Sequence, residues 1–298
     1  AFYMDQTEIT NNEYRQFVNW VRDSIARKIL AEEVDEEYYS NTINSYGEDM
    51  DPPSINWYAK MNWSGEEERE ALEVMFLPDY ERFYKRKQID TRKLMFEYSW
   101  IDYKTAASRF SREQGQIDRS VFIKKDIINV YPDTLAWVHD FTYSYNEPLT
   151  NMYFWHPSYD DYPLVGVSWK QARAFSIWRT ELLNNYLRGG GYSAVQHFRL
   201  PTESEWEWAS RGGLDNNQFP WGGPYIRNTA GCFLGNFKPL RGNYVDDGGL
   251  NTVKVFSYNP NDYGLFCMAG NVSEWTSNAF DESAYDFAHD MNMDYSYE

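Results

Sequence analysis

The segment "GLFCMAGNVSEW" at residues 264–275 decides how this chain is interpreted. It places Cys267, one of only two cysteines in the sequence, among glycines and close to Asn271 and Glu274. A cysteine in a glycine-bent, polar loop is compatible with catalysis, with metal binding or with a buried thiol that only packs. Other parts of the sequence must therefore decide whether this loop is an active site or belongs to a scaffold that has lost its catalytic residues.

The composition indicates a folded, acidic protein. Aromatic residues make up 18% of its 298 residues, and the formal net charge is −17. Nucleic-acid-binding proteins normally show the opposite charge balance, so nucleic acid is not an expected partner. Acidity fits solubility, cation binding or a basic protein partner. No run of 18 apolar residues and no signal peptide is visible, and we interpret the chain as a fragment or processed form.

Three short motifs predict where helices begin. In each, a Ser or Thr precedes a Glu or Gln by three positions, a spacing at which each side chain caps the other residue's backbone amide. The pairs are Thr10 with Glu13, Ser168 with Gln171, and Thr202 with Glu205. The third helix should be short, because Gly212 and Gly213 follow it closely.

Apolar residues at helical spacing support the first two of these helices. One predicted stripe comprises Tyr14, Phe17, Val18, Val21, Ile25 and Ile29, and the other comprises Ala172, Phe175, Trp178 and Leu182.

Strand signals are few and brief. The quartets "LVGV" at residues 164–167 and "VKVF" at residues 253–256 are the best candidates. The loop-rich sequence between them suggests that a metal or a partner stabilises this part of the chain. Residues 31–151 differ in composition from the rest of the chain, with alternating acidic and basic runs and scattered aromatic residues. We interpret them as helices and loops of uncertain order.

Four segments, taken in order, share the pattern of one known family. They are "FYMDQTEITNNEYRQFV" (2–18), "YPLVGVSWKQARAFSIW" (162–178), "RLPTESEWEWASRGG" (199–213) with "FPWGG" (219–223), and "NPNDYGLFCMAGNVSEW" (259–275). Together they resemble the formylglycine-generating-enzyme, or sulfatase-modifying-factor, family. The resemblance implies an α+β fold related to C-type lectins, with little regular secondary structure. It implies a single domain over residues 1–298 that lacks its C-terminal part and contains a long insert at 31–151.

A closer resemblance within the family comes from "MDQTEITNNEYRQFVNWVRDSI" (4–25), the long block after it and residues 264–275. These are similar to the gliding-motility and type IX secretion lipoprotein K group (GldK/PorK). That resemblance implies a structural, non-catalytic subunit at the periplasmic face of the outer membrane, held by a lipid anchor upstream of this chain. It also implies a ring built from neighbouring copies and from partner protein N of the same system.

The cysteine pattern argues against the oxidase chemistry of the family. That chemistry needs a redox-active cysteine pair late in the chain, whose thiolates bind copper. Here Cys232 and Cys267 precede or lie within the closing motif, and none follows Trp275. We therefore interpret Cys267 as a substitution and the chain as not an enzyme. Two other functions stay open: a cysteine-oxidising enzyme whose site lies beyond residue 298, and a glycan or peptidoglycan binder that uses the Trp-rich loops.

Calcium is the cofactor that the resemblance implies, held by carbonyl, amide and carboxylate oxygens. The implied ligands are, at a first site, the side chains of Asn236 and Asp247 with the carbonyls of Phe237 and Gly249, and, at a second, the carbonyls of Gly270 and Val272 with the carboxylate of Glu274. The family usually has Asn or Asp where Cys267 stands. A neutral thiol is a poor calcium ligand, which puts the second site in doubt. The alternative is that these side chains only bind loop amides.

The two cysteines are also candidates for a disulfide. Cys232 and Cys267 both lie in the loop-rich C-terminal half, and the expected compartment is oxidising. The alternative is two buried free thiols.

The insert is expected to carry most contacts with other proteins, because aromatic residues are enriched in interface cores. The alternatives are that the aromatic residues pack within their own domain and that the basic run is a solvated face. The residues predicted to bind partners are Trp57, Tyr58, Trp63, Lys85, Arg86 and Lys87.

Overall fold

The computed structural model describes residues 2–43, 47–110, 118–140, 149, 152–237, 243, 245–283 and 286. The chain divides into two compact units: unit 1 is Ala1–Arg15, Ile101–Ile123 and Pro132–Glu298, and unit 2 is Gln16–Trp100 and Lys124–Tyr131. These boundaries differ from those of the predicted insert at 31–151. Unit 2 begins inside the first helix, and residues 101–123 and 132–151 group with unit 1.

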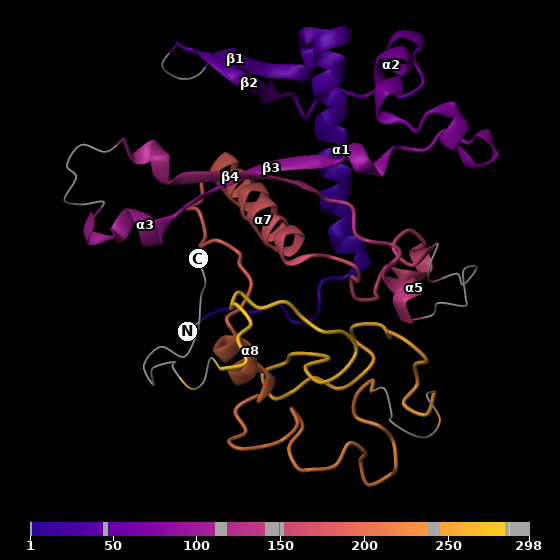
Figure 1. The fold of residues 1–298 in the computed structure, drawn as a ribbon, viewed down its shortest axis with the longest axis vertical. Helices are drawn as coiled ribbons and strands as arrows, with labels where there is room; N and C mark the ends of the chain where they lie inside the picture. Colours follow the sequence, from indigo (N-terminus) through magenta and orange to yellow (C-terminus); the bar gives the residue numbers. More distant parts are fainter. Residues whose placement is uncertain are drawn as a thin grey trace. The chain divides into compact units, whose positions relative to one another are not determined.

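Regular secondary structure is modest, and most of the chain after residue 211 is drawn as loops (Figure 1). The α-helices are α1 (Asn11–Glu33), α2 (Glu66–Ala71), α3 (Tyr103–Ala107), α5 (Ala136–Asp140), α7 (Trp169–Gly189) and α8 (Glu203–Ser210). The strands are β1 (Tyr39–Ile43), β2 (Asp49–Ile55), β3 (Met95–Ile101) and β4 (Ile123–Asn129). Short 3-10 turns lie at Glu36–Tyr38, Leu72–Met75, Asp79–Glu81, Phe83–Lys85, Thr91–Lys93, Arg119–Phe122 and Pro157–Tyr159. This mixture confirms the predicted α+β class.

The three predicted helix starts are confirmed. The Thr10 hydroxyl accepts a hydrogen bond from the Glu13 amide at 3.3 Å, and the Glu13 carboxylate accepts one from the Thr10 amide at 2.8 Å. α7 and α8 begin with the same reciprocal pairs, Ser168–Gln171 and Thr202–Glu205. Local side-chain chemistry therefore fixes these helix starts.

The stripe predicted for α1 is confirmed in its first half, where Tyr14, Phe17, Val18 and Val21 are buried. Further along α1 the deepest positions are taken by Ala26 and Leu30, while Ile25 and Ile29 only pack against them from the side.

The prediction that Leu182 belongs to the buried apolar stripe of α7 is wrong. Leu182 is 46% exposed, and the buried residues nearest to it in the helix are Thr180 and Asn184. The Asn184 side chain accepts a hydrogen bond from the Val195 amide at 2.8 Å and donates one to the Val195 carbonyl at 3.2 Å. Asn184 is polar because its side chain binds the backbone of Val195, in the segment that follows the helix.

Both predicted strands, at 164–167 and 253–256, are wrong. Their backbone groups bond to single positions in other loops: the Leu164 amide donates to the Ile9 carbonyl at 2.8 Å, and the Val255 amide donates to the Asp161 carbonyl at 3.0 Å. Residues 164–167 are partly buried, and Val253 and Val255 are buried while Lys254 and Phe256 are exposed, so burial without a ladder accounts for the apolar positions.

Within the described ranges, the strands that do form make two two-stranded sheets. β1 and β2 are antiparallel, with Tyr39 opposite Ile55 and two irregularities in the register. β3 alternates between exposed and buried residues, with Phe96 and Tyr98 inward. This period of two is the pattern of a half-buried strand.

Each unit has its own apolar core. In unit 2, Ala26 and Leu30 of α1 pack with Leu72 and Met75. In unit 1, Ala209 of α8 packs with Leu265, Met268 and partly buried neighbours. Among the described residues, no helix combines the length and the apolar character needed to cross a bilayer.

Candidate functional site

The four sequence segments that carry the family resemblance meet in unit 1. The Phe266 amide donates to the Gln6 carbonyl at 2.9 Å, which joins the closing motif to the N-terminal segment. The indole of Trp275 donates to the Val167 carbonyl at 2.9 Å. The Asn261 side chain donates to the Ala209 carbonyl at 2.8 Å. Hydrogen bonds between loops, and not the strands of a sheet, therefore hold the four segments together.

Asn271 lies at the centre of this arrangement. Its Nδ2 donates to Glu8 Oε2 at 2.7 Å and to the Val253 carbonyl at 3.3 Å. Its Oδ1 accepts from the Val253 amide at 2.9 Å and from Asn236 Nδ2 at 3.3 Å. One side chain thus connects three loops, including those proposed for both calcium sites.

The backbone of the closing motif is tightly constrained. Cys267 and Asn271 have left-handed φ angles of 53° and 63°, a conformation that Asn tolerates better than most residues. Gly270 has a φ of 94°, and a Cβ added there would lie 2.2 Å from the Asn236 carbonyl oxygen. Glycine is therefore required at 270 both for its conformation and for the close approach of the two loops.

At the first predicted site, Asp247 closes a loop. Its Oδ2 accepts from the Phe237 amide at 2.8 Å, and its Oδ1 accepts from the Gly249 amide at 3.3 Å. The Asn236 side chain donates to the Asn251 carbonyl at 2.7 Å. Each carboxylate oxygen keeps a lone pair, and the carboxylate, amide and carbonyl oxygens form the hard donor set that calcium takes. The residues present fit this cation, while the amide bonds also match the alternative of a loop closed without it.

The second predicted site, the carbonyls of Gly270 and Val272 with the carboxylate of Glu274, lies in the closing motif that also holds Cys267. Trp206 Nε1 donates to Glu274 Oε2 at 2.9 Å. Glu274 is exposed as a residue, but the protein atoms packed around its carboxylate desolvate it and raise its pKa, and the bond from Trp206 partly offsets this. Burial raises the pKa of Cys267 to about 12, and the charges of Glu8 and Glu274 act in the same direction. The thiol is therefore neutral, and it donates to the Val255 carbonyl at 3.4 Å.

Glu8 is the member of this group that the sequence analysis did not identify. It is only 8% exposed, and its Oε1 has no hydrogen-bond partner among the described residues. Burial raises the pKa of Glu8 to about 8; the bond from Asn271 lowers it, the charge of Glu274 raises it and the Val272 amide lowers it. A charged residue beside a helix start would be expected to be solvated, so no local pattern indicated its burial.

The predicted disulfide is not formed. Cys232 is an exposed free thiol, and Cys267 is a buried free thiol. The buried thiol occupies a constrained, left-handed position and bonds to Val255. Of the two alternatives, free thiols describe the structure, although only one of them is buried.

No group of three or more His, Cys, Asp and Glu side chains in the described part of the chain is placed to hold a metal ion. Any cation in this region must therefore use carbonyl and amide oxygens as well as carboxylates.

The residues predicted to bind partners lie in unit 2 and differ in exposure. Tyr58 is 98% exposed, whereas Trp57 is 39% exposed, because it stacks on Trp20 with 5.0 Å between ring centroids. Trp63 is partly buried and packs against the core of unit 2. Lys87 forms an ion pair of 2.6 Å with Glu73. Tyr58 is thus the aromatic residue of the predicted set that is fully available.

The side chains of Lys85 and Arg86 are also available, because neither has a partner among the described residues. They belong to the segment of residues 78–87, which we call the aromatic–basic loop. Its exposed aromatic residues are Tyr80, Phe83 and Tyr84 at 87%, 69% and 81% exposure. Of the residues predicted to bind partners, those that are exposed and available therefore lie in this loop and at Tyr58.

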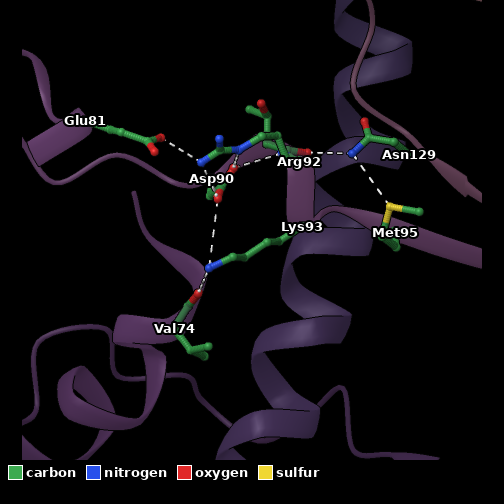
Figure 2. A network of polar contacts seen from close by, with 8 residues as sticks. Val74, Glu81, Asp90, Arg92, Lys93, Met95 and Asn129 are labelled. Atoms are coloured by element: carbon green, nitrogen blue, oxygen red, sulfur yellow. Dashed lines mark hydrogen bonds and ion pairs between the residues drawn. The ribbon is translucent and has the colours of Figure 1, made fainter. Parts of the chain in front are cut away.

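A polar network holds the chain that follows the aromatic–basic loop (Figure 2). Asp90 is 3% exposed and accepts from Arg92 Nε at 2.8 Å. Arg92 also reaches back to Glu81 of the loop at 2.7 Å, and Lys93 donates to the Val74 carbonyl at 2.6 Å. The hydrogen bonds from Arg92 hold the pKa of Asp90 below its ordinary value, so this carboxylate stays charged.

These features describe a loop-rich α+β domain whose closing motif is anchored on its own N-terminal segment. The family model of the sulfatase-modifying factor enzyme 1-like domain matches residues 1–295, and the chain belongs to this family. The formylglycine-generating-enzyme-like fold expected from the sequence is thereby confirmed.

Relatives named as formylglycine-generating enzymes and relatives named as inactive forms both resemble the chain. The inactive C-alpha-formylglycine-generating enzyme 2 of Bos taurus is 36% identical over 127 residues, which cover 42% of this chain and 36% of that protein. The formylglycine-generating enzyme of Streptomyces coelicolor is 38% identical over 128 residues, which cover 42% and 35%. That of Bos taurus is 38% identical over 120 residues, which cover 39% and 27%. The matched stretch thus spans between about a quarter and about a third of each relative's length.

Proposed function

We propose that this chain is a non-catalytic structural subunit of the periplasmic ring of the type IX secretion and gliding-motility machinery, in the lipoprotein K group. It would lie at the periplasmic face of the outer membrane, held by a lipid anchor upstream of the chain. Its partners would be neighbouring copies and partner protein N of the same system. The resemblance of the N-terminal and closing motifs supports the group, and a relative named as inactive supports a non-catalytic use of the fold.

The observation that carries the proposal is the construction of the aromatic–basic loop. An antiparallel bridge between Phe76 and Ile89 closes its base. Arg82 pairs with both Glu73 and Asp79, and it donates to the Leu77 carbonyl at 2.7 Å. These contacts fix the loop before any partner binds, so less conformational entropy would be lost on association.

The tip of the loop is both strained and exposed. Tyr84 and Lys85 have left-handed φ angles of 49° and 56°, which are unfavourable for residues with a Cβ. The rings of Phe83 and Tyr84 meet edge to face, with centroids 4.4 Å apart. Strain of this kind accumulates at functional positions, and exposed aromatic residues beside cations are suited to bind a partner with an acidic rim.

Neighbouring copies could supply such a rim. α2 presents the exposed carboxylates of Glu66, Glu67 and Glu70, and none of its residues is buried. A contact between the basic loop of one copy and α2 of the next uses different surfaces on each copy. Contacts of this heterologous kind generate rings when the rotation closes.

The test is a double charge reversal, Lys85→Glu with Arg86→Glu, in the full chain co-expressed with partner protein N. The matched control is Lys60→Glu with Lys124→Glu, which changes the net charge equally at exposed lysines outside the loop. We expect co-purification of protein N, or ring assembly measured by mass photometry, to fall at least about tenfold for the loop variant only. Circular dichroism should show both variants folded. Normal rings in the loop variant would overturn the assignment of the interface.

An active cysteine-oxidising enzyme is the second candidate, favoured by the relatives named as formylglycine-generating enzymes. The full-length protein, loaded with copper, would be incubated with a cysteine-containing peptide, and aldehyde would be measured by mass spectrometry. We expect no conversion above buffer. Conversion would replace the structural proposal with the enzymatic one.

A further inference from the structure

β1 is a strand with an open edge. It pairs with β2 on one side, and within the described ranges no strand pairs with its other side. Its residues from Ser40 to Ile43 are exposed, so no described segment covers this edge, and the hairpin extends away from α1 (Figure 1). An isolated two-stranded hairpin is only marginally stable in water, and an unpaired row of backbone amides and carbonyls is a template for another strand.

The sequence of β1 lacks the features that normally protect such an edge. Proline and charged side chains on an edge strand prevent further pairing. β2 contains Pro52, Pro53 and two aspartates, β3 contains Glu97, and β4 contains two lysines and an aspartate. β1, with the sequence "YSNTI", has no proline and no charged residue. Of the strands in the described ranges, β1 is therefore the one suited to accept a further strand.

The charges around this open edge define what it can bind. Between Lys28 and Lys60 the sequence contains no Lys or Arg, and its acidic residues are Glu32, Glu33, Asp35, Glu36, Glu37, Glu48, Asp49 and Asp51. Glu36 and Glu37 directly precede β1, and Asp49 lies opposite Ile43 at its end. Neither Glu36 nor Glu37 forms an ion pair with a described residue. Carboxylates at both ends of the strand favour a partner with positive charge.

We propose that β1 accepts an extended, basic segment of a partner protein as a third strand of its sheet. The segment would form backbone hydrogen bonds with Tyr39–Ile43, and Lys or Arg at its two ends would lie beside Glu36 and Glu37 and beside Asp49. In this mode of recognition the backbone bonds give the affinity, and the charges select the partner. Both the surface and the partner chemistry differ from those of the aromatic–basic loop, which is suited to an acidic rim.

The probe is a synthetic peptide, Lys-Thr-Val-Thr-Val-Thr-Lys, with both ends blocked. An extended strand of this length covers about 23 Å and spans β1. Isothermal titration calorimetry measures its binding to the full chain. The control peptide is N-methylated at the five central residues, so it keeps both charges and loses the amide donors that strand pairing needs. We expect the control peptide to bind at least about tenfold more weakly.

A matched pair of protein variants tests the charges. Glu36→Gln with Glu37→Gln removes two charges beside β1 and preserves the size of the side chains. Asp215→Asn with Glu282→Gln removes two charges at exposed carboxylates outside the hairpin. At low ionic strength we expect the first variant to bind the unmodified peptide at least about tenfold more weakly than the wild type, and the second to bind it equally. Circular dichroism checks that both are folded.

The proposal is overturned if the wild-type chain does not bind the peptide, or if the N-methylated peptide binds as tightly as the unmodified one. Equal binding by the wild type and by Glu36→Gln with Glu37→Gln would also overturn it, because the charges would then not select the partner. Dimers of the chain that dissociate when the peptide is added would assign the edge to a second copy instead of a partner protein. The ring-assembly test uses other residues, so either proposal can fail while the other holds.

Discussion

The Asn271 side chain donates a 2.7 Å hydrogen bond to Glu8 across 263 positions of sequence. This bond joins the closing motif to the segment that precedes α1. Because Asn271 also bonds to Val253 and Asn236, the geometry of both candidate calcium sites depends on a single side chain.

Replacing Asn271 should therefore destabilise unit 1 strongly. Asn271→Ala leaves partners in three loops unsatisfied, and each buried unsatisfied group costs about 1–3 kcal/mol. We expect a loss of about 3–5 kcal/mol in the free energy of unfolding, measured with urea. Asn216→Ala is the matched control, because Asn216 also has a left-handed φ, of 57°, but is exposed. Equal losses would show that the backbone conformation, and not the bonds, determines the effect.

Glu8 should give the protein an unusual dependence on pH. Its folded pKa, about 8, lies above the ordinary value of 4.5, so the neutral acid stabilises the fold. This contribution is complete below pH 4.5 and is lost as the pH rises through about 8. In calcium-free buffer we expect stability to fall by a few kcal/mol across this window. Glu8→Gln should flatten the fall, and an unchanged slope in that variant would contradict the assignment.

The local parts of the fold could be predicted from the sequence, because their causes lie within a few residues. Thr10 and Glu13 determine a helix start through a spacing of three, and the structure places both bonds as expected. The alternation in β3, with Phe96 and Tyr98 buried, is a comparable local signal for a strand that was not among those predicted. Val253 and Val255 were misassigned to a strand: both are buried, but the Val255 amide bonds to a single position in another loop and no ladder forms.

The candidate site could be predicted only in part. Asp247 and Glu274 came from a family pattern, whereas the role of Glu8 depends on a contact between the two ends of the chain. Periodicity and spacing within one sequence carry no information about such pairs. The same limit applies to Lys87, which pairs with Glu73 instead of facing solvent freely.

The two cysteines should differ sharply in reactivity. Cys232 is exposed, whereas burial raises the pKa of Cys267 to about 12, so that little thiolate is present near neutral pH. With a thiol-reactive chromophore at pH 8, we expect Cys267 to react at least roughly a hundredfold more slowly. Both should react after denaturation without reductant. Titration of no free thiol under those conditions would restore the disulfide.

Calcium at the first site should depend on Asp247. If the ion binds there, saturating calcium at about 100 times its dissociation constant adds about 2.7 kcal/mol to the free energy of unfolding. Asp247→Asn should lose this gain, whereas Asp246→Asn should keep it, because the Asp246 carboxylate pairs with Arg227 instead. Differential scanning calorimetry with calcium and then with chelator measures the gain. A wild-type melting temperature that is the same under both conditions rules out the site.

Gly270 gives the sharpest structural test of how the two calcium loops approach each other. A Cβ at this position would lie 2.2 Å from the Asn236 carbonyl oxygen, so the Asn236 loop would have to move. Gly223 has a similar left-handed φ, of 78°, but nothing lies within 4 Å of its Cβ position. Gly223→Ala should therefore cost about 1–2 kcal/mol, the price of the conformation alone. We expect Gly270→Ala to cost more than about 3 kcal/mol, because backbone overlap adds to the conformational penalty. Urea unfolding of the two variants measures the difference, and equal values would mean that the loops are not in contact as described.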